Sequence, residues 1–165
     1  MSIEHTNEEN PTLETAIGYL EQDWSVIPIN PTSKKPYIPW KRYQQRRPTD
    51  GEVEQWFRNW PDARLAVVTG ELSGIVIVDC DSEEAHQFAI EEGLSSPVRV
   101  KTKRGVHHYF DHPRDGKRRG PRVGGNSRGT DWPKFDGIDF RGDGSYALLP
   151  PSPSYEWDIE YPFSQ

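Results

Sequence analysis

Apolar residues recur at helical spacing in three parts of the chain. The first of these parts follows Pro11, a common first residue of a helix. The second begins with Thr49 and Glu52, which have the spacing of a capping box, and ends before Pro61. Helices are therefore expected over residues 12–22, 49–60 and 82–92.

Shorter apolar runs separate these helices and predict strands. Three pairs of runs are joined by short turns, over residues 70–73, 103–105 and 142–145, and each pair is expected to form a hairpin. Pro28 indicates an edge strand for the first run. Strands are expected at 24–30, 65–69, 74–79, 98–102, 106–110, 137–141 and 146–149. The fold class predicted is α+β, a mixed or antiparallel sheet with flanking helices.

The length of 165 residues predicts one domain. We expect it to span residues 12–160, between a flexible N-terminus at 1–11 and a loose C-terminal tail at 161–165. No apolar run is long enough to span a membrane, and no secretory leader is evident, so a cytoplasmic protein is expected. Cys80 has no partner for an internal disulfide and is predicted to be a small core residue.

The net charge of −6 argues by itself against a polyanionic partner, but the basic residues are concentrated. Sixteen of the 20 lysines and arginines lie within residues 24–49 and 99–128, where the only acids are Asp111 and Asp115. Local potential decides whether a polyanion docks. A solvated loop surface is the ordinary alternative. The candidate nucleic-acid contacts are Lys34, Lys35, Lys41, Arg42, Arg46, Arg47, Arg118 and Arg119.

An aliphatic run from Gly74 to Val78 leads directly into Asp79 and Asp81. Side chains alternate along a strand, so the two carboxylates are expected on one face at its end. Two like charges this close indicate a divalent cation, such as Mg²⁺ with substrate phosphates. The alternative is a strand that ends in a turn, with Asp81 or Ser82 capping the next helix.

A second polar cluster lies in the hairpin over residues 98–110. His107 shares a face with Tyr109, and Lys103 and Arg104 at the turn suit phosphate oxygens. Zinc is a poor alternative, because adjacent histidines point opposite ways in a strand and no cysteine partners exist. A hairpin with a solvated basic tip is the other interpretation.

A third cluster centres on Asp139, which alternates with Ile138 and Phe140. A carboxylate on a half-apolar strand needs a partner, and a metal shared with Asp79 and Asp81 would provide one. A surface aspartate on a strand with one solvated face is the alternative. Asp143 is expected to belong to the following turn.

Together these motifs resemble the primase-polymerase domain of the archaeo-eukaryotic primase superfamily, of the kind found in plasmid and phage replication proteins. The motifs are the apolar strand into Asp79-x-Asp81, TxRGxHxYF at 102–110 and GIDFRGDGSYALLPPS at 137–152. The resemblance covers about residues 13–157. It includes the opening WSVIPI at 24–29 with Trp40, and LAVVTG at 65–70.

The resemblance implies an RRM-like primase catalytic core and a template-directed DNA primase or polymerase that uses Mg²⁺ or Mn²⁺. By motif, the metal-binding and catalytic residues are Asp79, Asp81 and Asp139. His107 would contact the triphosphate of the incoming nucleotide, with Arg104, Lys103 and Arg141 as further phosphate contacts by position. The implied partners are DNA template and primer, nucleoside triphosphates, and a helicase or other replication protein, in a prokaryotic plasmid or phage setting.

Two departures from the family pattern stand out. Gly105 occupies a position where many relatives have serine, and the spacer between Pro150-Pro151-Ser152 and Tyr155-x-Trp157 is short. Trp40 or Tyr43 is expected to stack on a base. Four alternatives remain open: a glycosyltransferase, which needs a larger donor domain, a metal-dependent nuclease, a non-catalytic DNA-binding replication module, and a relative that binds nucleotides without turnover.

Overall fold

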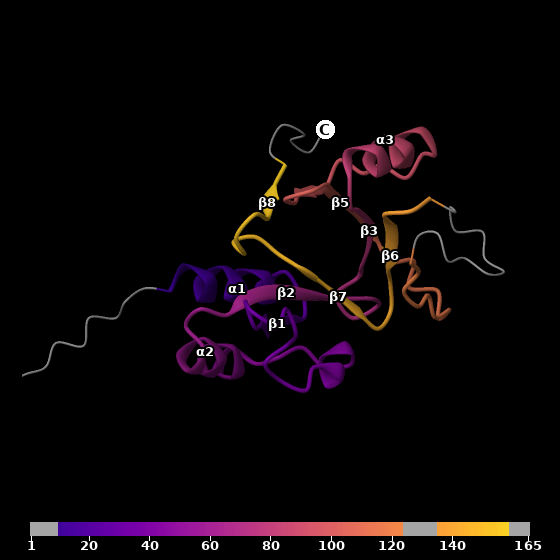
Figure 1. Cartoon of the computed structure of the whole chain (residues 1–165). Coiled ribbons are helices and arrows are strands. Elements are labelled where there is room, and N and C mark those ends of the chain that lie inside the picture. The colour runs from indigo at the N-terminus through magenta and orange to yellow at the C-terminus, as the bar shows by residue number, and fades with distance from the viewer. Residues whose placement is uncertain (1–9, 124–134, 159–165) are drawn as a thin grey trace, which may run out of the picture.

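The computed structural model describes residues 10–123 and 135–158, and it confirms the α+β class (Figure 1). The helices are α1 (Pro11–Glu21), η1 (Lys41–Gln44, a 3-10 turn), α2 (Asp50–Asn59) and α3 (Glu83–Glu91). The strands are β1 (Val26–Ile29), β2 (Arg64–Thr69), β3 (Ile75–Cys80), β4 (Arg99–Lys101), β5 (Val106–Asp111), β6 (Ile138–Arg141), β7 (Ser145–Leu148) and β8 (Glu156–Trp157).

Side-chain caps fix the start of each α-helix. Asn10 accepts hydrogen bonds from the first turn of α1, and Thr49 and Glu52 form the predicted capping box of α2. Ser82 caps α3, so the helix-capping interpretation of this segment is correct for Ser82. None of the helices in the described ranges is both long and apolar enough to cross a membrane.

The strands form two antiparallel sheets. The first sheet has the order β1-β2-β7, and the second has the order β6-β3-β5-β4-β8. In Figure 1, α1 and α2 lie with the first sheet and α3 lies with the second. β1 is an edge strand of the first sheet, as Pro28 predicts.

Only one of the three predicted hairpins is a ladder between neighbouring strands. β4 and β5 pair as expected, but β2 and β3 lie in different sheets, and so do β6 and β7. These two hairpin predictions are wrong. Both turns reverse the direction of the chain, with Gly70 and Gly144 at positive φ. The strands before and after each turn belong to different sheets. Turn chemistry specifies a change of direction, whereas strand pairing is decided by distant partners.

The second sheet lies between two apolar clusters, so alternate residues of β3 face different layers. Ile75 and Ile77 belong to the main core, which the first sheet also lines. Val78 and Cys80 belong to a smaller cluster with α3. We call these the core face and the helix face of the second sheet. Cys80 is fully buried on the helix face, which confirms its prediction as a core residue.

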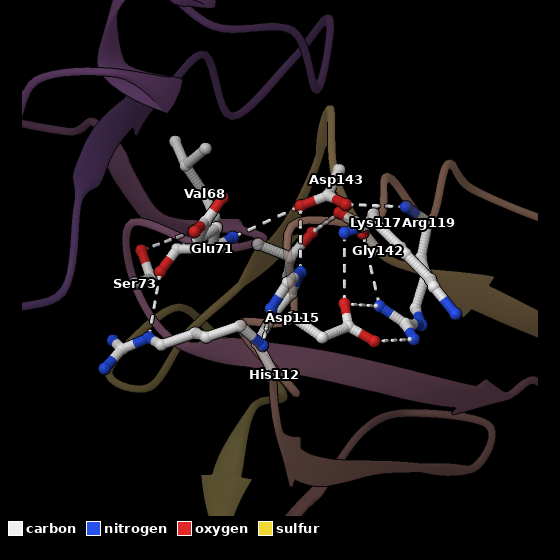
Figure 2. Close-up of polar contacts among 11 residues, drawn as sticks. Val68, Glu71, Ser73, His112, Asp115, Lys117, Arg119, Gly142 and Asp143 are labelled. Carbon is white, nitrogen blue, oxygen red and sulfur yellow. Dashed lines mark hydrogen bonds and ion pairs between the residues drawn. The ribbon is translucent and has the colours of Figure 1, made fainter.

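The carboxylate of Asp143 connects the two turns that cross between the sheets (Figure 2). Its Oδ1 accepts hydrogen bonds from the Glu71 backbone N–H (3.2 Å) and from His112 Nε2 (3.1 Å), and its Oδ2 accepts one from the Arg119 N–H (2.7 Å). His112 Nδ1 accepts from the backbone N–H of Arg114, so the ring proton lies on Nε2. Asp143 is a turn residue, as expected.

Candidate active site

A pocket of about 680 Å³ opens where β3 ends, and the first residue of β2 also lines it. Its acidic residues are Asp79 and Asp81. Its basic residues are Lys34, Arg64, Lys103, Arg104, His107 and Arg141. A concave surface with this excess of cations suits a phosphorylated ligand.

Asp79 is the penultimate residue of β3 and lies on the core face, and its side chain is only 14% exposed. Its Oδ2 accepts hydrogen bonds from Arg141 Nη2 (2.9 Å) and Nε (3.1 Å), and its Oδ1 lies 3.3 Å from His107 Nε2. Burial alone would raise the pKa of Asp79. The hydrogen bond and charge of His107, with the charge of Arg141, outweigh it and lower the pKa to about 2. Asp79 is therefore a carboxylate at neutral pH.

Asp81 follows β3 and is more open to solvent. Its Oδ1 pairs with Arg104 Nη2 at 3.2 Å, with side chains that are 54% and 73% exposed. An ion pair this exposed contributes little to stability. Both groups can exchange this contact for a ligand at small cost.

Asp139 lies on β6 directly opposite Asp79 in the antiparallel register. Directly opposed residues project from the same side of a sheet. Asp139 therefore shares the core face with Asp79 and is half-buried. Asp79, Asp81 and Asp139 all belong to the described part of the chain, but their carboxylate oxygens do not all lie within 4.8 Å of one another.

His107 is the histidine that faces the pocket, as the strand phase predicts. It lies opposite Asp79 in the β3–β5 ladder, whereas His108 lies opposite Val78 and faces α3. His107 Nδ1 is buried and has no hydrogen-bond partner among the described residues. Such an atom in a site is one that a bound ligand can satisfy.

The turn before His107 explains the departure at Gly105. A Cβ at this position would lie 1.8 Å from the carbonyl oxygen of Cys80, so only glycine allows the turn to approach the end of β3. Thr102 Oγ1 accepts a hydrogen bond from the Gly105 N–H (3.0 Å), and Thr102 lines the pocket. A hydroxyl is thus present beside this turn although serine is absent.

The predicted nucleic-acid contacts fall into two groups. Three of them are held by contacts within the chain: Arg46 pairs with Glu52, Arg47 donates to the carbonyls of Asp23 and Leu72, and Arg119 pairs with Asp115. The remaining five are exposed: Lys34, Lys35, Lys41, Arg42 and Arg118. Of these five, Lys34 lines the pocket.

The predicted base-stacking role is wrong for Tyr43. Its ring is 4% exposed and packs edge-on against Trp56, and its hydroxyl donates to Glu52. Trp40 is half-buried, with its ring edge-on to Tyr146.

Among the charged and aromatic residues that line the pocket, sequence reasoning missed Arg64 and Tyr155. Arg64 begins β2 and stands outside both basic segments, so nothing in the local sequence marks it. Tyr155 lies in the segment before β8, with its ring centroid 5.8 Å from that of His107. The Tyr-x-Trp spacing marks Tyr155 as a motif residue, but it carries no information about where the ring lies.

An α+β fold with acidic residues at a strand end in a basic pocket suits a phosphorylated ligand and a divalent cation. Residues 16–162 match the family described as "Bifunctional DNA primase/polymerase, N-terminal" (Prim-Pol), and the chain belongs to this family. Membership supports an enzyme of the primase/polymerase type, a nucleotidyltransferase that acts on DNA and nucleotides and depends on divalent metal. No curated protein matches the chain.

Proposed function

We propose that this chain catalyses template-directed nucleotidyl transfer, with Asp79, Asp81 and Asp139 as the ligands of its divalent cations. The observation that carries the proposal is the register of β3 and β6, which sets Asp139 opposite Asp79 beside a basic pocket. Arg141, His107 and Arg104 offset part of the negative charge of Asp79 and Asp81, and a divalent cation would offset more of it.

The residues fit a hard divalent ion. Carboxylate oxygens are the ligands that Mg²⁺ and Mn²⁺ prefer, and Asp79 is ionised in spite of its burial. Cations held there would activate a 3′ hydroxyl and stabilise the leaving pyrophosphate. Arg141 and His107 hold Asp79 in place from two sides.

The basic residues of the pocket suit the triphosphate. Arg104 and Lys103 lie at the turn beside His107, and Arg141 comes from β6. Phosphoryl transfer requires mainly positioning and charge stabilisation, which fixed cations supply. We assign these four residues to the nucleotide phosphates.

DNA would lie along the exposed basic residues. Lys34, Lys35, Lys41, Arg42 and Arg118 are assigned to template and primer phosphates, with Arg46, Arg47 and Arg119 in a lesser role because they have partners within the chain. Replacing one phosphate-binding lysine is expected to reduce the slope of log affinity for DNA against log salt concentration by about one.

The test is a template-dependent assay with labelled DNA, run with Mg²⁺ or Mn²⁺, with each nucleotide type, and with and without primer. Wild-type protein is expected to extend or initiate a strand, and Asp79→Asn is expected to do neither. Degradation of the DNA without nucleotides would instead indicate a nuclease. Metal-independent DNA binding without synthesis would indicate a replication-accessory module.

Asp111→Asn is the matched control. Asp111 is an exposed aspartate at the opposite end of the β3–β5 ladder from Asp79, where it pairs with Ile75. This variant is expected to retain synthesis. Full activity of both Asp79→Asn and Asp139→Asn would contradict the proposal.

A further inference from the structure

Behind the pocket, on the helix face of the second sheet, three side chains with nitrogen or sulfur ligand atoms meet. Cys80, the last residue of β3, lies between Asp79 and Asp81 in the sequence but points to α3. There it meets His86, and His108 of β5 completes the group. The three ligand atoms all lie within 4.8 Å of one another. Figure 1 shows α3 lying over this part of the sheet.

The surroundings make this polar group unusual. Its neighbours include the apolar residues Val78, Ala85, Ala89 and Ile138, and the backbone N–H of Ser96 and the charge of Arg99 act on His108. Cys80 and His108 are fully buried, and His86 is half-buried. An ion would therefore reach the group from the side of His86.

The ring nitrogens are already directed at one another. His86 Nδ1 lies 3.0 Å from His108 Nε2, and the rings are stacked with an interplanar angle of 23°. Burial, the largest cause, lowers the pKa of both histidines, that of His108 to about 4. Neutral imidazole is the form that binds a metal ion.

We propose that Cys80 Sγ, His86 Nδ1 and His108 Nε2 form a binding site for a borderline-soft divalent ion such as Zn²⁺, separate from the carboxylate site. Thiolate and imidazole together select zinc-like ions, whereas carboxylates select Mg²⁺ and Mn²⁺. β3 thus presents hard ligands on one face and softer ligands on the other. The ion would fix α3 to β3 and β5 directly behind Asp79 and Asp81. The expectation that these histidines have no cysteine partner is wrong for His108, which lies beside Cys80.

Binding requires two proton movements. The Ser96 N–H donates to His108 Nδ1 at 3.1 Å, so the proton of His108 lies on Nε2 and points at His86. The ion takes the place of that proton, which moves to Nδ1 as the Ser96 contact is released. Burial raises the pKa of the Cys80 thiol to about 12, so the ion itself must displace the thiol proton, which passes to solvent. One backbone hydrogen bond contributes far less than a zinc–thiolate site.

Co²⁺ replaces Zn²⁺ and reports the ligands by absorption. Cys80 is the only cysteine of the chain, so a thiolate-to-cobalt charge-transfer band can arise only from it. We expect Co²⁺ added to the full reduced chain to produce this band, and Zn²⁺ to abolish it by displacement. Cys80→Ser is expected to lack the band.

His86→Asn tests the ligand set with little risk to the fold, because His86 is half-buried on α3. It is expected to weaken Co²⁺ binding by about 100-fold or more, since even the loss of an outer-shell partner costs 10–100-fold. His107→Asn is the matched control, because the adjacent histidine faces the opposite side of β5, and it should retain the band.

Absence of the band in wild-type protein with an intact thiol would overturn the proposal. A Co²⁺ affinity of His86→Asn equal to that of the wild-type protein would also overturn it. The readout does not involve nucleotidyl transfer, so its outcome is independent of the proposed function.

Discussion

Asp79 and Asp139 stand opposite each other on β3 and β6, although α3, β4 and β5 separate them in the chain. Both face the core side of the second sheet, where Arg141 and His107 contact Asp79. This pairing brings residues of two distant motifs to opposite positions on one face of the sheet.

The two carboxylates are expected to act as a unit in catalysis. Asp79→Asn and Asp139→Asn should each reduce strand extension by more than about 100-fold, because loss of even an outer-shell partner of a metal ligand costs 10–100-fold. The double variant should be little worse than either single variant, as for residues that serve one site. Primer extension measures the loss, and circular dichroism checks the fold. Independent, multiplicative losses would argue against a shared centre.

Acid is expected to remove a specific contribution of Asp79 to stability. The pKa of Asp79 in the folded protein is about 2, below the ordinary value of 3.8. A carboxyl group with a lowered pKa in the folded state stabilises the fold at pH values above the pKa of the unfolded state. This stabilisation is lost as the pH falls through the pKa of the folded state. The window is therefore about pH 4 to 2, and the contribution is about 2 kcal/mol.

Denaturant unfolding of wild-type protein and of Asp79→Asn measures this effect. The difference in the pH dependence of their unfolding free energies should appear between pH 4 and 2. Parallel curves across that window would show that Arg141 and His107 do not stabilise the ionised form.

Gly105→Ala is expected to destabilise the turn between β4 and β5. The added methyl group would meet the Cys80 carbonyl, a backbone atom that cannot move without distorting β3. Overpacking of this kind costs about 1–3 kcal/mol. Gly93→Ala is a useful comparison, because no atom lies within 4 Å of a Cβ there, although its φ of +73° carries its own strain. Thermal unfolding should show the larger loss for Gly105→Ala.

Local sequence predicted the elements well because each depends on near neighbours. The cap residues Thr49 and Ser82 mark helix starts directly, and the aliphatic runs mark β2 and β3. The division of these strands between two sheets depends on tertiary partners. Nothing in Gly70 or Gly144 indicates which strand will pair with which.

Strand alternation predicted which side chains of the site share a face of their own strand. Alternation placed Asp79 with Asp81 and His107 with Tyr109 in two separate clusters. The resemblance to the primase-polymerase family joined the clusters, and the register sets His107 opposite Asp79. Arg64 was not predictable, because an isolated arginine before an apolar run has no distinguishing spacing. Tyr43 was predicted to stack on a base because it is an aromatic residue in a basic loop, but its side chain is buried in the core.

Arg104→Ala is expected to weaken nucleotide binding with little effect on the fold. Its pair with Asp81 is exposed, so stability should change by less than about 1 kcal/mol. A charge-assisted phosphate contact is stronger, and its loss should raise the KM for nucleotide about 10- to 100-fold. Arg58→Ala, on the exposed surface of α2, is the control that should leave KM unchanged. An unchanged KM in Arg104→Ala would exclude Arg104 from the phosphate site.

Asp143→Ala is expected to loosen the junction between the two sheets. It removes the acceptor of His112, whose side chain is 1% exposed, and the acceptors of the Glu71 and Arg119 N–H groups. A buried donor left without a partner costs about 1–3 kcal/mol. Asp143→Asn retains one carbonyl oxygen and should lose less. Hydrogen exchange at the amides of Glu71 and Arg119 distinguishes this cause from general destabilisation, because these two amides should lose protection first. Uniform loss of protection across both sheets would show that Asp143 is not the local link between the turns.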